Sequence, residues 1–228
     1  FSHGMAIAFL LKKKMMKHTL FLLLLCVLFF LGALLRGQEM FSHNFLFLLD
    51  QGRDMMAVKK IIYDLHPTLI GPNTSLQGVF QGPLWYYLLA IPTFITGGDP
   101  WGSIVLMFIV SITVLIVVYI CMSELFGKKV GFVTLFLFAI SPEAVAAATY
   151  SWNPHPMWLL IVLYLFCFYE LINKKYRYHL FVWPILALMF HFQSALAFFL
   201  LIATFIVAFL YYRFIFRQRY FFIGILIS

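Results

Sequence analysis

The sequence predicts an all-α protein, a polytopic bundle of transmembrane helices with a long outer loop that carries amphipathic interfacial helices. Apolar residues make up 64% of the 228 residues and charged residues 11%, whereas a soluble domain has about 45–50% and about 25%. The apolar residues gather in runs near the length of about 20 residues that a helix needs to cross a bilayer. This composition excludes a soluble enzyme, a disordered chain and a nucleic-acid-binding protein, and it makes membrane lipids the expected surroundings.

The apolar runs divide the chain into a series of expected spans. These are 18–35, 101–123, 129–149, 155–172, 178–192 and 194–212, and a further span starts at 219. The sequence begins at Phe1 and stops at Ser228, a few residues into a new apolar run. We therefore expect residues 1–228 to be the N-terminal part of a single transmembrane domain whose C-terminal remainder is missing.

Residues 84–96 are apolar but short and contain Pro92, so they either span the membrane or lie in its interface. Cytoplasmic loops carry most Lys and Arg residues. If the N-terminus is inside and 84–96 does not span, twelve basic residues are cytoplasmic and four are outside. The four are Arg36, Arg53, Lys59 and Lys60, and the twelve are Lys12, Lys13, Lys14, Lys17, Lys128, Lys129, Lys174, Lys175, Arg177, Arg213, Arg217 and Arg219. A rival topology, with the N-terminus outside and 84–96 spanning, gives the same division but exports the lysine cluster before the first span. We favour the first topology, which places 36–100 outside as one loop.

The outer loop holds most of the acidic residues of a chain that has few other places for chemistry. Within it, residues 54–66 have apolar side chains at helical spacing, which predicts a short amphipathic helix that lies on the membrane. Asp54 is the expected N-cap of this helix and Pro67 its expected stop. Lys59 and Lys60 lie on the polar face, where they would meet anionic headgroups or a donor phosphate.

A compact polar set, Asp50-Gln51-Gly52-Arg53-Asp54, stands at the start of this helix. The free N–H groups of a helix N-terminus favour a phosphate, and an arginine binds one with two hydrogen bonds. The same five residues are more often a capped, solvated turn at the start of a helix. Their spacing alone does not separate the two interpretations.

Three other polar patches fall on the same outer side in the favoured topology. One stands at the start of 84–96, where tyrosines fit either an interfacial anchor or the wall of a cleft. The other two lie in short loops between later spans, where histidine usually makes structural hydrogen bonds. The convergence of the patches on one face nevertheless favours a binding site. Its candidate substrate-binding residues are Tyr86, Tyr87, Asn153, His155, His191 and Gln193.

Motifs for a cofactor are absent from the sequence. It has no Walker loop, no G-x-G-x-x-G, no H-x-x-x-H and no C-x-x-C. The three cysteines lie inside apolar runs, as packed thiols do. We therefore expect neither a cofactor nor a metal site.

The order of these motifs resembles the N-terminal half of the bacterial membrane glycosyltransferases with the GT-C fold. The nearest group is the glycosyltransferase family 39 type, akin to protein O-mannosyltransferases and the lipid A aminoarabinose transferase. The resemblance runs from about Lys17 to Ser228 and is carried by Asp50-Gln51-Gly52-Arg53-Asp54, Gly71-Pro72, Gly82-Pro83-Leu84-Trp85-Tyr86-Tyr87 and Trp152-Asn153-Pro154. The family carries its catalytic carboxylate in the first outer loop, which maps onto Asp50. Many relatives have Asp-Glu at this point, whereas this chain has Asp50-Gln51.

The resemblance implies an inverting glycosyltransferase in the bacterial cytoplasmic membrane, with its active site facing outward. The donor would be a sugar on a polyprenyl phosphate, and the acceptor a hydroxyl of a lipid, glycan or protein. Asp50 is the expected general base, because a sugar hydroxyl is too weak an acid to attack unaided. Arg53 is expected to hold the donor phosphate, and Asp54 is either a second acidic residue of the site or the N-cap. Two alternatives stay open: a transporter or flippase of lipid-linked saccharides, and a non-catalytic membrane scaffold.

Overall fold

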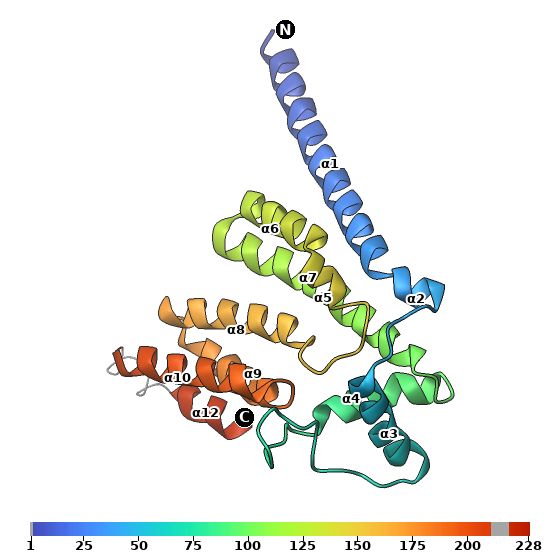
Figure 1. The fold of residues 1–228 in the computed structure, drawn as a ribbon. Coiled ribbons are helices and arrows are strands. Elements are labelled where there is room, and N and C mark those ends of the chain that lie inside the picture. Colours follow the sequence, from blue (N-terminus) through green and yellow to red (C-terminus); the bar gives the residue numbers. More distant parts are fainter. Residues whose placement is uncertain (1, 211–218) are drawn as a thin grey trace.

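The computed structural model describes residues 2–210 and 219–228, and within these ranges the chain is helical and forms no β-strand (Figure 1). Two helical segments, Lys12–Arg36 and Trp101–Phe126, are long and apolar enough to cross a membrane. Many large apolar side chains are exposed along the helices, Phe209 and Leu226 among them. A soluble monomer rarely exposes so much apolar surface. The predicted all-α membrane fold is confirmed.

Helix α1 covers Ser2–Arg36 and extends away from the rest of the molecule (Figure 1). It begins well before residue 18, where the first span was predicted to start. The sequence between contains no proline, so nothing in it ends the helix upstream of the apolar run. The basic cluster is therefore a continuation of the same helix.

Three helices fill the predicted outer loop: α2 (Gln38–Ser42), α3 (Leu49–Tyr63) and α4 (Leu84–Ile95). Helix α4 packs against α3, and its Trp85 and Leu89 are fully buried. Twelve residues of helix are about 18 Å long at 1.5 Å per residue, which is shorter than the hydrocarbon core of about 30 Å. This length agrees with an interfacial position for 84–96, which stays a prediction.

Helices α5 (Trp101–Phe126) and α6 (Lys128–Ile140) form a tight hairpin. A Cβ atom on Gly131 would lie 2.0 Å from the Ser123 Oγ atom, so the two helices approach closely only because residue 131 is glycine.

Helix α6 ends earlier than the span predicted for 129–149. Ser141 is extended, and the short helix α7 (Pro142–Ala146) follows it in a new direction. The cause is Pro142, which disfavours helical backbone at the preceding residue and has no N–H to donate. Residues 129–149 therefore do not form one continuous helix.

Arg36, at the end of α1, is buried with 1% of its surface exposed. Its guanidinium donates to the Ser111 Oγ atom at 2.9 Å and to the carbonyls of Phe138 and Ala139 at 2.8 Å each. The last carbonyls of a helix have no partner within the helix. Arg36 thus caps α6 and joins α1 to both α5 and α6.

The remaining helices agree with the predicted spans to within a few residues where they are described. They are α8 (Met157–Ile172), the 3-10 turn η1 (Tyr176–Tyr178), α9 (His179–Phe190), α10 (Ser194–Leu210) and α12 (Arg219–Ile227). Of the basic residues assigned to the cytoplasm, Arg213 and Arg217 lie outside the described residues. The number of crossings and their orientation stay predictions.

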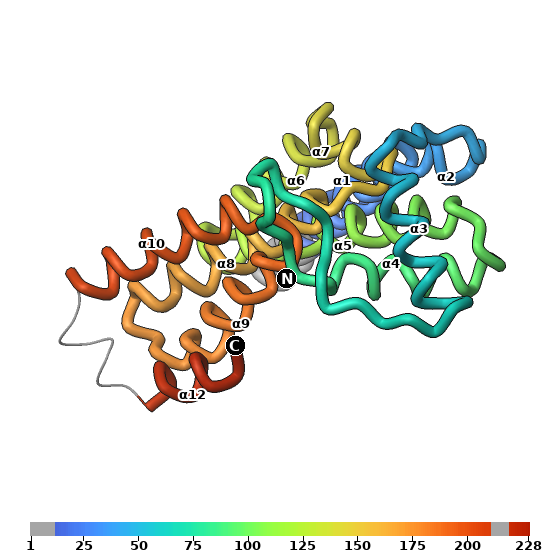
Figure 2. The backbone as a smooth tube through the Cα atoms, turned by 60° about the horizontal axis from the view of Figure 1, so that its bottom comes forward, coloured from blue at the N-terminus to red at the C-terminus, as the bar shows by residue number. Residues whose placement is uncertain are grey.

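The larger hydrophobic core joins α3, α4, α8, α9 and α10 and also takes in Met107 of α5 and Phe221 of α12, and a smaller one joins α1, α5 and α6. Helices α3 and α4 lie at one end of the molecule, and α10 and α12 at the other (Figure 2). The segment between α3 and α4 runs from the first end towards the start of α10. This arrangement brings the predicted polar patches together.

Candidate functional site

The polar set at residues 50–54 lies inside the first turns of α3. The side-chain oxygen of Gln51 accepts the backbone N–H of Leu48 at 2.7 Å, and the Leu48 carbonyl accepts from Gly52 at 3.0 Å. These bonds start the helix at Leu49. The prediction that Asp54 caps a helix beginning at residue 54 is therefore wrong, because Gln51 already supplies the capping group.

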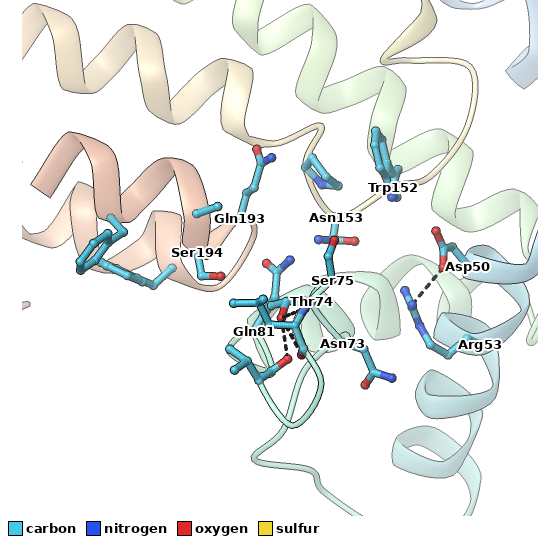
Figure 3. Close-up of a pocket in the computed structure, with 16 residues that line it drawn as sticks. Asp50, Arg53, Asn73, Thr74, Ser75, Gln81, Trp152, Asn153, Gln193 and Ser194 are labelled. Atoms are coloured by element: carbon cyan, nitrogen blue, oxygen red, sulfur yellow. Dashed lines mark hydrogen bonds and ion pairs between the residues drawn. The ribbon is translucent and has the colours of Figure 1, made fainter.

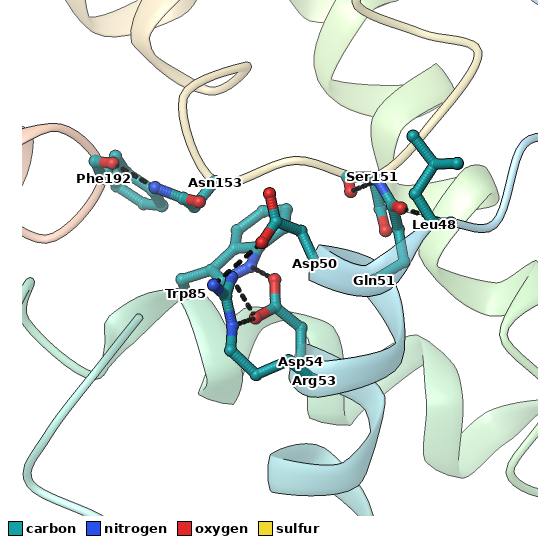
Figure 4. Close-up of polar contacts among 9 residues, drawn as sticks. All are labelled: Leu48, Asp50, Gln51, Arg53, Asp54, Trp85, Ser151, Asn153 and Phe192. Carbon is teal, nitrogen blue, oxygen red and sulfur yellow. Dashed lines mark hydrogen bonds and ion pairs between the residues drawn. The ribbon is translucent and has the colours of Figure 1, made fainter. Parts of the chain in front are cut away.

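Arg53 lies between two carboxylates of the same helix (Figure 4). Its Nη1 atom is 3.0 Å from the Oδ1 atom of Asp50, and its Nη2 atom is 2.8 Å from Oδ1 of Asp54. The other Asp54 oxygen accepts from the indole N–H of Trp85 at 2.7 Å. Asp54 has 1% of its side chain exposed and Asp50 has 54%. Asp54 thus holds Arg53 from the buried side of the network, whereas Asp50 remains open to a ligand.

Burial sets the ionisation of the inner part of this network. It raises the pKa of Asp54, although the hydrogen bonds from Trp85 and Arg53 oppose the shift. Burial also raises the pKa of the neighbouring Tyr86 hydroxyl. Tyr86 packs beneath the network in the core and contributes to its surroundings without lining the cavity described below.

One hydrogen bond joins α3 to the loop that precedes α8, and a second joins that loop to the loop that precedes α10. The Gln51 side-chain amide donates to the carbonyl of Ser151 at 2.8 Å, and the Asn153 amide donates to the carbonyl of Phe192 at 2.6 Å (Figure 4). Three segments that lie up to about 140 residues apart in sequence are therefore fixed around one point. The residue after Asp50 is therefore a cross-link in this chain. An ionised carboxylate at this position could not donate a hydrogen bond to the carbonyl.

The segment 71–82 forms a short hairpin that completes the site. Gly71 and Gln81 are joined by a backbone hydrogen bond of 3.0 Å, and Thr74 donates to Val79 at 3.0 Å. A Cβ atom on Gly82 would lie 2.0 Å from the Nδ1 atom of His191, so the base of the hairpin rests directly on that ring. The glycines thus allow the hairpin to approach both itself and the loop before α10.

A cavity of about 760 Å³ lies between α3, this hairpin and the loops before α8 and α10. Asp50 and Arg53 face it from one side and Gln193 and Ser194 from the other, with Asn153 between them (Figure 3). The hairpin contributes Asn73, Thr74, Ser75, Leu76, Val79 and Gln81, and the other lining residues are Trp152, Pro154, Phe190, Ala195 and Phe198. We name this the first cavity. It combines a carboxylate, a guanidinium and several neutral hydrogen-bonding groups with apolar walls.

Four of the candidate residues, Asp50, Arg53, Asn153 and Gln193, line the first cavity. Trp152, Ser194 and the side chains of the hairpin were not among the residues predicted from the sequence. The paired Gly-Pro dipeptides at 71–72 and 82–83 were the available signal, because they bracket a segment that must turn back on itself.

The other candidates lie elsewhere. Lys59 and Lys60 are exposed on α3 away from the cavity. The Tyr87 hydroxyl exchanges hydrogen bonds with the backbone of Thr68, at 3.1 and 2.9 Å, and so fixes the segment after α3. His191 supports the hairpin, and burial lowers its pKa. Tyr87 and His191 thus support the site without lining the first cavity, and Lys59 and Lys60 take no part in it.

His155 lies next to the first cavity, in the loop before α8. Its Nδ1 atom is 3.0 Å from the carbonyl of Tyr150, and burial lowers its pKa to about 4. The ring is therefore neutral near pH 7. In the described part of the chain, no group of three or more His, Cys, Asp or Glu side chains is arranged to hold a metal ion.

Comparison with known proteins gives one family. A family model described as dolichyl-phosphate-mannose-protein mannosyltransferase matches residues 80–228, which include Trp152, Asn153 and Gln193 and begin after Asp50 and Arg53. Neither the curated proteins nor the solved structures give a match. The matched segment covers more than half of the 228 residues, and the helices that it spans form the walls opposite α3. The chain therefore belongs to the dolichyl-phosphate-mannose-protein mannosyltransferase family, as a membrane glycosyltransferase.

Proposed function

We propose that this protein is an inverting glycosyltransferase that moves a sugar from a polyprenyl-phosphate donor to an acceptor hydroxyl, at the outer face of the bacterial cytoplasmic membrane. The observation that carries the proposal is the position of Asp50. Its half-exposed carboxylate faces a cavity large enough for a sugar, beside a guanidinium and opposite the residues that the family match covers.

The reaction needs a base at the acceptor hydroxyl. As the oxygen of this hydroxyl forms a bond to the anomeric carbon, the bond from that carbon to the phosphate oxygen breaks. The hydroxyl proton passes to the Asp50 carboxylate, and the lipid phosphate leaves as an anion. Attack from the face opposite the phosphate inverts the anomeric centre. General-base assistance of this kind contributes about 10²–10⁴-fold to a rate.

Two features of the first cavity provide positive potential for the donor phosphate. Arg53 uses three N–H groups on Asp50 and Asp54, and the guanidinium has five, so hydrogens remain on it for a ligand. On the opposite side, Ser194 and Ala195 are the first residues of α10, where backbone N–H groups lack partners within the helix. We assign the phosphate to Arg53, and the start of α10 adds to the positive potential from the opposite wall.

The two carboxylates beside Arg53 lower its affinity for a phosphate. Two carboxylates face one guanidinium, so the cluster attracts an anion less strongly than a lone arginine would. Asp54 is buried and stays paired, whereas the exposed pair with Asp50 is worth only about 0–1 kcal/mol. A phosphate can therefore replace Asp50 on Arg53 at small cost, which also frees the carboxylate to act as a base.

The test compares three activities of the full-length protein in proteoliposomes. Radiolabelled mannosyl polyprenyl phosphate is supplied with a mixed set of glycan, lipid and peptide acceptors, and GDP-mannose is supplied in parallel as the control donor. We expect label to pass from the lipid donor to an acceptor and none to pass from the nucleotide. Movement of intact donor between leaflets without transfer would indicate a flippase, and donor binding without either activity would indicate a scaffold.

A further inference from the structure

A second cavity of about 330 Å³ adjoins the first. The two share three lining residues, Trp152, Pro154 and Gln193. The second cavity extends from them towards α7 and α8, where Glu143, Tyr150, His155 and Trp158 line it. A ligand whose reacting hydroxyl lies beside Asp50 can therefore continue past Trp152 into this space.

Aromatic rings form one wall of the second cavity. The rings of Tyr150 and Trp152 are stacked, with centroids 6.2 Å apart at 28°, and the His155 ring lies 4.6 Å from Tyr150 and 5.5 Å from Trp152. Backbone bonds fix the arrangement, because His155 N–H donates to the Trp152 carbonyl at 3.0 Å and the ring Nδ1 atom bonds to the Tyr150 carbonyl. Within this rigid cluster Trp152 still has 38% of its surface exposed.

The charge of the second cavity differs from that of the first. Among its described lining residues, Glu143 carries the only charge, and no arginine or lysine is present. Since a carbonyl only accepts, the Nδ1 atom of His155 carries the ring hydrogen, and its Nε2 atom remains an acceptor. The Gln193 amide offers both a donor and an acceptor. This cavity therefore disfavours a phosphate and suits a neutral ligand that carries hydroxyl groups.

We propose that the second cavity binds a sugar unit of the acceptor, which stacks on Trp152, so that the acceptor is a glycan or a glycolipid headgroup rather than a protein side chain. The apolar face of a pyranose ring packs on an aromatic ring, while its hydroxyls bond to groups at the ring edge, here Glu143, Gln193 and His155. A serine in an extended peptide presents no such face. An acyl chain would offer no hydrogen-bond partner to the Gln193 amide. The assignment to an acceptor rests on the proposed transferase function.

The first experiment measures binding without donor and is independent of transfer. Saturation-transfer NMR of the full-length protein in micelles uses neutral mannopentaose as the probe and a serine-threonine peptide as the comparison. We expect signal for the pentasaccharide in the parent and loss of it in Trp152→Ala, with partial recovery in Trp152→Phe. Phe41→Ala, an exposed aromatic outside both cavities, serves as the matched control and should keep the signal.

The second experiment measures transfer kinetics with mannosyl polyprenyl phosphate as donor and mannopentaose as acceptor. Trp152→Ala should raise the acceptor KM about tenfold, which is the loss of a contact of about 1.4 kcal/mol, and should change the donor KM less than twofold. An unchanged acceptor KM, or a rise in the donor KM instead, would overturn the acceptor site. If the parent transfers sugar to the peptide and not to the pentasaccharide, and Trp152→Ala does so at the same rate, the proposed acceptor site would also be wrong. Trp152-dependent sugar binding without any transfer would retain the sugar site and reject the transferase.

Discussion

Asp54→Asn should destabilise the protein, although asparagine has the same shape. The aspartate accepts from Trp85 at 2.7 Å and from Arg53 at 2.8 and 2.9 Å, with 1% of its side chain exposed. Removal of the charge leaves Arg53 without its inner partner and weakens the bond to Trp85. Hydrogen bonds to charged groups contribute about 1.5–3 kcal/mol, and breaking a fully buried pair costs about 3–5 kcal/mol.

The expected cost lies below the buried-pair figure for two reasons. Arg53 is 34% exposed and keeps Asp50, and the raised pKa of Asp54 shows that burial already disfavours its charge. We therefore expect a loss of about 2–3 kcal/mol, or about 5–10 °C in melting temperature for a chain of this size. Asp50→Asn breaks only the exposed pair and should cost about 0–1 kcal/mol.

Thermal unfolding in detergent, followed by tryptophan fluorescence, measures both variants against the parent. The control is Asp64→Asn, because Asp64 is exposed at the end of α3 and lies outside both cavities. If Asp54→Asn melted with the parent and Asp50→Asn did not, the roles that we assign to the two carboxylates would be wrong.

Three further predictions concern the surroundings of Asp50. Arg53→Gln should weaken donor binding in a filter assay at least tenfold, and Arg177→Gln, a change at an exposed arginine on η1, should leave it unchanged. Gln51→Glu should lower both the melting temperature and the transfer rate, because a carboxylate cannot donate to the Ser151 carbonyl; full activity at neutral pH would show that the cross-link is dispensable. Burial lowers the pKa of His155 from 6.5 to about 4, so the unfolded chain takes up the proton first as the pH falls, and stability is lost between these two values. Between these two pH values the melting temperature should fall less in His155→Asn than in the parent. Equal slopes of melting temperature against pH for variant and parent would contradict this prediction.

The helices were predictable because their apolar runs are local properties of the sequence. The predicted positions of α5, α8, α9 and α10 differ from the structure by a few residues where the chain is described. The one predicted span that is not a single helix, 129–149, contains Pro142. Here the proline outweighed the apolar composition, and the sequence already contained the evidence.

The surroundings of Asp54 and Arg36 could not be predicted from the sequence, because partners far away in the chain decide what these side chains do. Asp54 has the chemistry of an N-cap, but α3 already begins at Leu49, so Asp54 lies inside the helix, where Trp85, 31 residues later, donates to its buried carboxylate. The burial of Arg36 could not be predicted either, because the carbonyls that bind its guanidinium belong to α6, about 100 residues later.

The candidate site was predictable only in part. A shared outer side for three polar patches predicted that Asp50, Asn153 and Gln193 would lie near one another, and the structure brings them to one cavity. The hairpin side chains could not be assigned to this cavity from the sequence. Their place depends on the contact between Gly82 and His191, which no local pattern encodes.

The most direct test of the central claim separates donor binding from sugar transfer in Asp50→Asn. The full-length variant is loaded with labelled mannosyl polyprenyl phosphate, and the dissociation constant and the single-turnover rate are measured on the same preparation, with Asp64→Asn as control. If Asp50 is the base, the dissociation constant stays within about twofold of the parent value while the rate falls by about 10²–10⁴-fold. A transfer rate near that of the parent in Asp50→Asn would contradict the claim.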